Sequence, residues 1–298
     1  MNTRAQVRLL PDGRRLHLHD GPIDIVLEAY AISESEVRAA YDAAADRFLT
    51  VLDELCAELP LLRTQTRPGS RGPRGIIARR MFAAVIPFAG EQFITPMAAV
   101  AGAVAEELLN AMTNAAILSR AYVNDGGDIA LHLSPGESFT IAMIDRPDRP
   151  SLFGTMKLES SQPVRGIATS GWRGRSFSRG IADAVTVLAN SAATADAAVT
   201  IVANAVDLPG HTAIQRTSAR ELSPDTDLGE ILVTTKVAGL TNSEIAQALS
   251  HGAECAEHLC AQGLLHAAAL HLQGTTRIVM ADRSTLPAPH RESSVAYA

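Results

Sequence analysis

Aromatic residues, cysteines and long apolar runs are all scarce in this chain. Phe, Tyr and Trp together make up 4% of the 298 residues, which limits aromatic stacking surfaces and leaves small residues to let elements approach closely. Cys56, Cys255 and Cys260 show no C-x-x-C spacing, so we expect reduced structural thiols. No run of about 18 apolar residues is present, which excludes a spanning helix. Residues 1–8 lead into no apolar segment, so we expect no secretory leader and a cytoplasmic location.

The charge balance is mildly acidic, with a formal net charge of −6. We therefore expect no general attraction to nucleic acid or to an anionic membrane. Apolar residues make up 47% of the chain and charged residues 19%, which is typical of a soluble globular protein. The slim Ala-rich segment 98–105 could serve a homo-oligomer interface as readily as a core.

Short alternating apolar segments follow one another as hairpins, separated by long helical patterns. The two predicted hairpins span 14–31, around Asp20-Gly21-Pro22, and 264–280, around Gln273-Gly274. Further strands are expected at 129–133, 138–144, 153–158, 163–169, 181–190 and 231–237, and helices at 33–59, 95–110, 194–206 and 242–262 with Asn242 as the last N-cap. The pattern predicts an α+β fold with mainly antiparallel sheet. We predict one domain over 1–290 and a frayed polar tail at 283–298.

Four short segments combine Gly or Ala with one or two oxygen-bearing side chains, which lets backbone approach a ligand closely. They are 96–102 (PMAAVAG), 124–128 (NDGGD), 168–171 (ATSG) and 195–200 (ADAAVT). Gly126-Gly127-Asp128 predicts either a tight hairpin turn or a ligand-facing turn, and the two are compatible. Thr169-Ser170-Gly171 follows a predicted strand. Ser170 is a weak candidate nucleophile, because no G-x-S-x-G surrounds it.

Asp196 and Thr200 lie four apart in a helical pattern, so both side chains share one helix face. A carboxylate and a hydroxyl so placed can hold a hard cation together with waters and a ligand phosphate. The spacing alone favours ordinary helix surface or capping, because Asp and Thr commonly bond nearby backbone.

Two arginine-rich segments could bind anions. Residues 63–80 form a basic, Gly- and Pro-rich connector that includes Arg71 and Arg74, and a solvated loop is the competing interpretation. Arg173 and Arg175 follow Ser170-Gly171 and alternate with glycine. A metal site at His251, Glu254 and His258 is less favoured than a solvated helix face, since no H-E-x-x-H is present.

The four segments, in their residues and in their order along the chain, resemble those of the UPF0280 family, distant relatives of the ApbE-type FAD:protein FMN transferases. The resemblance runs from about residue 21 to 208 and implies an ApbE-like, T-fold-like architecture. It also implies a cleft that binds FAD or FMN, with Mg²⁺ held by Asp196 and Thr200. The matching cofactor-binding positions are Met97, Gly126, Gly127, Asp128, Thr169, Ser170 and Gly171.

Two departures from the transferase pattern shape the functional expectation. The D-x-G-G-x-A-K-G motif is replaced by residues 96–103, which have neither the acid nor the Lys, and H-x-x-D-P-x-T-G is absent after Gly171. Without these two motifs, the chain lacks many of the residues that would stabilise a leaving phosphate. We therefore expect binding of a flavin or other nucleotide rather than FMN transfer. The alternative is a hydrolase or transferase that acts on a small anionic metabolite in the same cleft.

Overall fold

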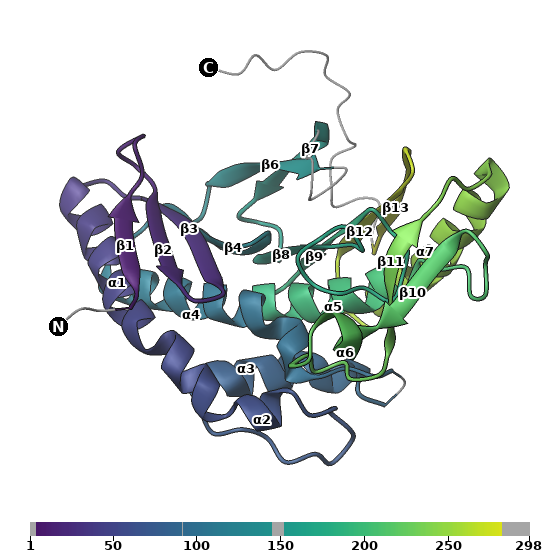
Figure 1. The fold of residues 1–298 in the computed structure, drawn as a ribbon. Helices are drawn as coiled ribbons and strands as arrows, with labels where there is room; N and C mark the ends of the chain where they lie inside the picture. The colour runs from purple at the N-terminus through teal and green to yellow at the C-terminus, as the bar shows by residue number, and fades with distance from the viewer. Residues whose placement is uncertain (1–3, 91, 145–151, 282–298) are drawn as a thin grey trace.

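A computed structural model describes residues 4–90, 92–144 and 152–281. Its centre is a nine-stranded sheet in the order β1-β2-β3-β4-β5-β8-β9-β12-β13 (Figure 1), in which every neighbouring pair is antiparallel. The strands are β1 (Gln6–Leu9), β2 (Leu16–Asp20), β3 (Ile23–Tyr30), β4 (Arg120–Asp125), β5 (Asp128–Leu133), β8 (Gly166–Ser170), β9 (Ala184–Ala189), β12 (Ala267–Leu272) and β13 (Thr275–Met280). Both predicted hairpins and the α+β class with mainly antiparallel sheet are confirmed. The polar tail at 283–298 lies outside the described residues.

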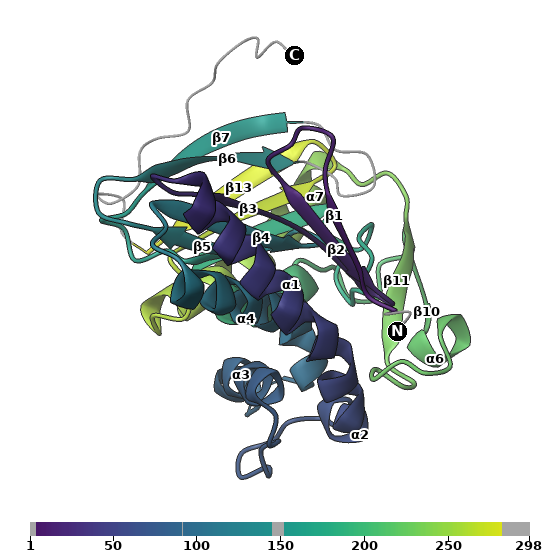
Figure 2. The ribbon, with the colours of Figure 1, turned by 90° about the vertical axis from the view of Figure 1, so that its left-hand side faces the viewer.

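Helices cover one face of this sheet. Helix α4 (Val100–Ala115) packs on β4 and β5, α5 (Ala192–Ala205) on β8 and β9, and α7 (Asn242–Ala261) on β12 and β13. Helix α1 (Glu34–Ala57) packs against α4 and β3, and α2 (Leu59–Leu62) and α3 (Ile76–Val85) lie farther from the sheet (Figures 1 and 2). No helix in the described part of the chain is both long enough and apolar enough to cross a membrane.

Alternation along the strands decides which side chains face the helices. In β4, Ala121, Val123 and Asp125 are buried, whereas the residues between them are half-buried. The same parity continues in β5, where Asp128 pairs with Asp125 and Ala130 with Val123. Because side chains alternate between sheet faces, both aspartates lie on the helix-covered face of the sheet.

A two-stranded ribbon covers part of the opposite face (Figure 2). It consists of β6 (Ser138–Ile144) and β7 (Leu152–Glu159). A second, smaller apolar cluster lies beneath it and includes Leu131, Leu158 and Ile167. The remaining pair, β10 (Ile214–Ser218) and β11 (Leu232–Val237), stands beside the main sheet with the short α6 (Ala219–Leu222).

Helices α1 and α7 each begin directly after a residue whose side-chain hydroxyl caps the helix. Ser33 caps α1 through the Glu36 amide, as its position predicts. The expectation of Asn242 as the cap of α7 is wrong. Thr241 caps that helix, because Thr241 and Glu244 form a reciprocal capping box that is unavailable to the next residue.

Two other helices differ from the sequence prediction. The predicted helix at 95–110 begins as a 3₁₀ turn, η2 (Pro96–Ala99), before α4 runs on to Ala115. Part of the connector at 63–80 is helical, because α3 begins at Ile76. The apolar residues Ile77, Ala78 and Met81 of that helix are buried, which shows that tertiary packing outweighs its glycine-rich start.

Candidate functional site

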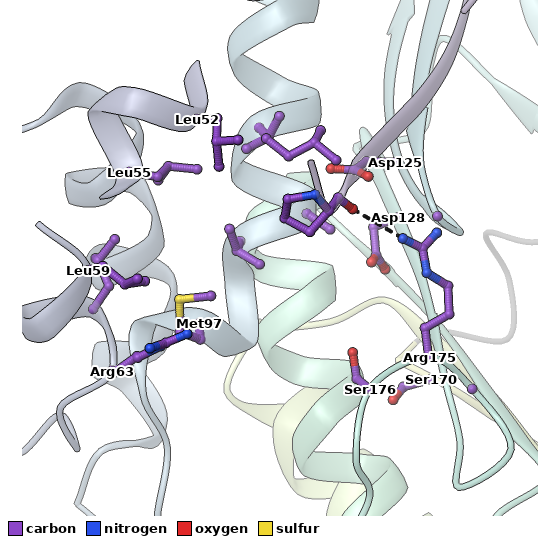
Figure 3. Close-up of a pocket in the computed structure, with 18 of the residues that line it drawn as sticks. Leu52, Leu55, Leu59, Arg63, Met97, Asp125, Asp128, Ser170, Arg175 and Ser176 are labelled. Atoms are coloured by element: carbon purple, nitrogen blue, oxygen red, sulfur yellow. Dashed lines mark hydrogen bonds between the residues drawn. The ribbon is translucent and has the colours of Figure 1, made fainter. Parts of the chain in front are cut away.

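A cavity of about 570 Å³ opens between the C-terminal part of α1, the start of α4 and three turns at one end of the sheet (Figure 3). Its wall toward the helices is apolar, and its wall toward the sheet is polar. The apolar residues are Ile23, Leu52, Leu55, Leu59, Leu62, Met97, Val100 and Val104. The polar side consists of Asp125, Asp128, Thr169, Ser170, Arg175 and Ser176. This volume and this mixture are typical of a small-molecule site.

The β4–β5 turn builds the floor of the polar side. Gly126 and Gly127 adopt φ values of 66° and 116°, and the Asn124 side-chain oxygen accepts a hydrogen bond from the Gly127 amide at 2.8 Å. Other residues resist positive φ, so the pair of glycines allows a two-residue turn here. The turn thereby places Asp125 and Asp128 opposite each other at the cavity.

Three carboxyl groups lie near one another at this end of the sheet. Asp125 and Asp128 line the cavity, whereas Asp196 does not. Burial is the main cause that raises the pKa of Asp125 to about 7. Burial and the neighbouring Asp196 and Asp125 raise the pKa of Asp128 well above its ordinary value. Burial also raises the pKa of Asp196, with Asp125 adding to the effect. One oxygen of Asp128, Oδ1, is buried without a hydrogen-bond partner among the described residues.

Asp196 also has a structural task. Its Oδ2 accepts a hydrogen bond from the Gly102 amide at 3.0 Å, in the first turn of α4. The N-cap residue of α4 is Ala99, whose side chain cannot accept a hydrogen bond. Asp196, which lies on the neighbouring helix α5, therefore caps the start of α4 in its place. Backbone hydrogen bonds from Gly102 and Ala101 to this carboxylate also favour its charged form, although burial outweighs them and raises its pKa.

The donor set fits a hard cation that arrives with its ligand. Asp128 has an unpartnered buried oxygen, and the neighbouring carboxylates of Asp196 and Asp125 help to raise the pKa of Asp128. A bound cation would relieve this repulsion. Within the described residues, no cluster of three or more His, Cys, Asp or Glu side chains is placed to hold a metal ion. For such a cation Asp128 and Asp196 would be the candidate carboxylates, and further oxygens would have to come from water or from a phosphate.

Thr200 lies one helical turn beyond Asp196 on α5. Its hydroxyl donates to the Asp196 carbonyl at 3.2 Å. It lines a separate small cavity of about 40 Å³ beside Thr95 and Asp227, not the main cavity. Its oxygen keeps lone pairs free, but the main cavity does not reach it.

Arg175 connects the turns around the cavity. It comes from the loop after β8 and donates to the Pro22 carbonyl of the β2–β3 turn at 3.3 Å (Figure 3). A Cβ at Gly126 would lie 3.0 Å from its Nη1, so the guanidinium also lies against the β4–β5 turn. Its charge lowers the pKa of Asp125 and Asp128, although burial outweighs this effect.

The other proposed anion ligands lie elsewhere. Arg173 forms an ion pair with Asp183 at 2.7 Å and does not line the main cavity. Arg71 lines a separate cavity of about 170 Å³ next to Thr66. Arg74 lines none of the three cavities described here, and its backbone amide donates to Glu58 at 2.7 Å. Arg63, from the same connector, does line the main cavity.

Six of the seven cofactor positions expected from the resemblance line the cavity. They are Met97, Gly126, Asp128, Thr169, Ser170 and Gly171. Gly127 supplies the turn geometry instead, and the Thr169 hydroxyl bonds Thr186 on β9 at 3.0 Å. Sequence reasoning did not identify the apolar wall from α1 and α2. Its only sequence signal is the amphipathic pattern of residues 33–59, which does not say what the apolar face covers.

The histidines considered as metal ligands serve other contacts. His251 bonds the Asp207 carbonyl at 2.9 Å, and His258 bonds Gln262 at 2.8 Å. Glu254 accepts a hydrogen bond from Ser250 at 3.1 Å. These contacts are those of an exposed helix face.

A family model described as "AbpE bacteria" matches residues 7–278. A UPF0280 protein of Methanosphaerula palustris is 33% identical over 185 residues, covering 58% of this chain and 71% of that protein. A UPF0280 protein of Methanopyrus kandleri is 38% identical over 129 residues, covering 43% of this chain, which spans about half (48%) of that protein.

A solved structure, "Flavin Transferase ApbE from Vibrio cholerae", is 13% identical, covers 93% of this chain and 97% of its own, and aligns with a TM-score of 0.41. The match of the family model over almost the whole described chain, and the coverage of the Methanosphaerula relative, establish the family. The chain belongs to the bacterial AbpE family and is a member of the UPF0280 group.

Proposed function

We propose that this protein binds a flavin nucleotide, FAD or FMN, or a related nucleotide, together with Mg²⁺, in the main cavity. The observation that carries the proposal is the buried, unpartnered Oδ1 of Asp128 on the polar wall of a cavity whose opposite wall is apolar. A buried polar atom without a partner is costly, so a cation or ligand that satisfies it is favoured. The family relationship is consistent with a flavin ligand.

Each wall suits one part of such a ligand. The apolar side chains of α1, α2 and η2 suit a ring system, because burial of apolar surface contributes about 25 cal/mol per Å². Arg175 and Arg63 can pair with phosphate oxygens. Asp128 would hold Mg²⁺, which would neutralise the charge of the phosphates, and Asp196 would join it where the site extends beyond the cavity lining. Thr200 remains a proposed ligand that requires the site to extend along α5.

Thermal unfolding with FAD, FMN, ATP and AMP, each with and without Mg²⁺, tests the proposal. A ligand that binds only the folded state stabilises it and so raises the melting temperature. At a ligand concentration one hundred times Kd the stabilisation free energy is about 2.7 kcal/mol. We expect a shift with a flavin nucleotide that requires Mg²⁺. No shift with any of the four would refute the nucleotide proposal.

Matched variants locate the site. Asp128→Asn should abolish the Mg²⁺-dependent part of the shift, since an amide cannot replace a charged ligand to Mg²⁺. Asp196→Ala should abolish it as well but should also lower the basal melting temperature, because Asp196 caps α4. Asp225→Asn, at an exposed loop position, is the control and should behave as the unmodified protein.

The second candidate function, a hydrolase or transferase for a small anionic metabolite, rests on Arg63 and Arg175, which both line the cavity. Stabilisation by small phosphates or carboxylates, with none by nucleotides, would favour it. Transfer of FMN to a protein is not part of the proposal, because the residues that replace the transfer motifs lack its acid and its Lys. The single domain, cytoplasmic location and homo-oligomeric state remain predictions.

A further inference from the structure

We infer that Asp183 is a positioning residue that fixes the cavity loop, residues 171–176, in its ligand-ready conformation by holding Arg173 away from the cavity. This inference rests on the proposed function only for its consequence for binding. Asp183 is 4% exposed, and it lies in the segment between that loop and β9. The cavity itself does not contact Asp183.

The two oxygens of Asp183 have different partners. Oδ1 accepts from Arg173 Nε at 2.7 Å, and Oδ2 accepts from the Gln273 amide at 2.7 Å. Gln273 has a φ of 43°, the one positive value among the described non-glycine residues, and it forms the β12–β13 turn. Through Asp183, the cavity loop is therefore fastened to the turn of a different hairpin.

That second turn is itself well anchored. The Gln273 side chain accepts from the Leu240 amide at 3.0 Å and donates to the Ala238 carbonyl at 2.8 Å. Both partners lie just before α7. Asp183 thus connects the cavity loop to a part of the molecule that the ligand does not touch.

The geometry of the loop explains why Arg173 matters for Arg175. The Gly174 amide donates to the Gly171 carbonyl at 2.9 Å, so residues 171–174 form a tight turn with Arg173 inside it. Arg173 also stacks on Trp172 at 4.2 Å. Gly171, Gly174, Arg175 and Ser176 line the cavity, whereas Trp172 and Arg173 do not.

The ion pair therefore sets which arginine of the loop reaches the cavity. A Cβ on Gly171 would lie 2.9 Å from the Ala182 carbonyl, so the backbone has little freedom at the start of the turn. With Arg173 held by Asp183, Arg175 points into the cavity and bonds the Pro22 carbonyl. Without the Arg173–Asp183 ion pair, nothing would keep Arg173 out of the cavity and Arg175 in it.

Trypsin cleavage of the ligand-free protein after Arg175 tests the inference. Arg175 is exposed, and cleavage requires local opening of the loop. We expect Asp183→Asn and Arg173→Gln each to raise the cleavage rate at this bond by about tenfold or more, because proteolysis follows the population of the opened state. The double variant should show no further increase, since both changes break one interaction.

The fluorescence emission of Trp172, the one tryptophan of the chain, should change in the same variants, because Arg173 stacks on its ring. Asp207→Asn is the control, because it breaks a partly buried ion pair with Arg216 that involves none of residues 171–176. An unchanged cleavage rate at Arg175 in both test variants would overturn the inference, whether or not Asp183→Asn folds as stably as the unmodified protein. Arg173→Gln keeps the test valid because Arg173 is less buried than Asp183.

Nucleotide titration separates the two proposals. If the unmodified protein binds nucleotide, both variants should weaken that binding by about tenfold or more while Asp207→Asn leaves it unchanged. Equal affinity in the variants would overturn the positioning role. If the unmodified protein binds no nucleotide, the proposed function fails, and the cleavage experiment alone decides the inference.

Discussion

Replacement of Asp125 by Asn should stabilise the protein at neutral and alkaline pH. Burial raises the pKa of Asp125 to about 7 from its ordinary 3.8. The unfolded chain therefore loses this proton near pH 4, whereas the folded protein keeps it up to about pH 7. Stability consequently falls as the pH rises between these values and is constant outside them.

The size of the effect follows from the two pKa values. A pKa of about 7 in the folded protein against 3.8 in the unfolded chain corresponds to about 4 kcal/mol above pH 7. Water in the cavity reduces this penalty, so we expect Asp125→Asn to gain roughly 2 to 4 kcal/mol at pH 8. Since 1 kcal/mol shifts the melting temperature of a large domain by about 2 to 4 °C, the gain is easily measured.

The assay is denaturant unfolding of both proteins between pH 4 and 8.5, with a chelator present so that no bound cation neutralises the carboxylates. The stability difference should be near zero at pH 4 and should grow until about pH 7. Asp225→Asn, which changes an exposed carboxylate, provides the control. A difference that does not depend on pH, or a loss of stability at pH 8, would refute the argument that burial of Asp125 is costly.

Three further predictions concern packing, recognition and capping. Gly102→Ala should cost about 1 to 3 kcal/mol in urea unfolding, because its Cβ would lie 2.5 Å from a backbone carbon of α5, whereas Gly239→Ala, with nothing within 4 Å, should be neutral. Arg175→Ala should weaken phosphate-bearing ligands about tenfold in a titration, and Arg71→Ala should not, since only the former lines the main cavity; equal effects would contradict this. Thr241→Ala should cost about 1 kcal/mol through loss of the capping box, and an unchanged melting temperature would show that the box is dispensable.

Local patterns in the sequence predict the polar half of the site well. Gly126-Gly127 requires positive φ at adjacent positions, so the turn can be recognised without the fold. Ser170 is the last residue of β8, a strand that β propensity and alternation indicate one residue shorter at this end. The hairpins and the start of α1 at Ser33 follow from equally local rules.

The rest of the site depends on contacts that are distant in the chain. Leu55 of α1 and Arg63, directly after α2, line the same cavity as Met97 of η2, and no local pattern indicates that these distant segments meet there. Arg173 and Arg175 look equivalent in the sequence, and Asp183, ten residues beyond Arg173, distinguishes them. Thr200 shares a helix with Asp196, yet the packing of η2 against α5 places it at a different cavity.

The strand ladder is thinnest beside the cavity. The register of β5 and β8 has two pairs, Ile129–Ile167 and Ala130–Gly166, followed by one bond from the Leu131 amide to the Arg165 carbonyl, whereas β4 and β5 pair over six positions. Strands β1 to β5 and strands β8, β9, β12 and β13 are thus two halves of the sheet joined at a narrow seam. Asp128 ends one side of this seam and Ser170 the other, so a molecule bound across it would fasten the halves together. Occupancy would then slow amide exchange far from the ligand, in every strand whose opening requires the seam to part.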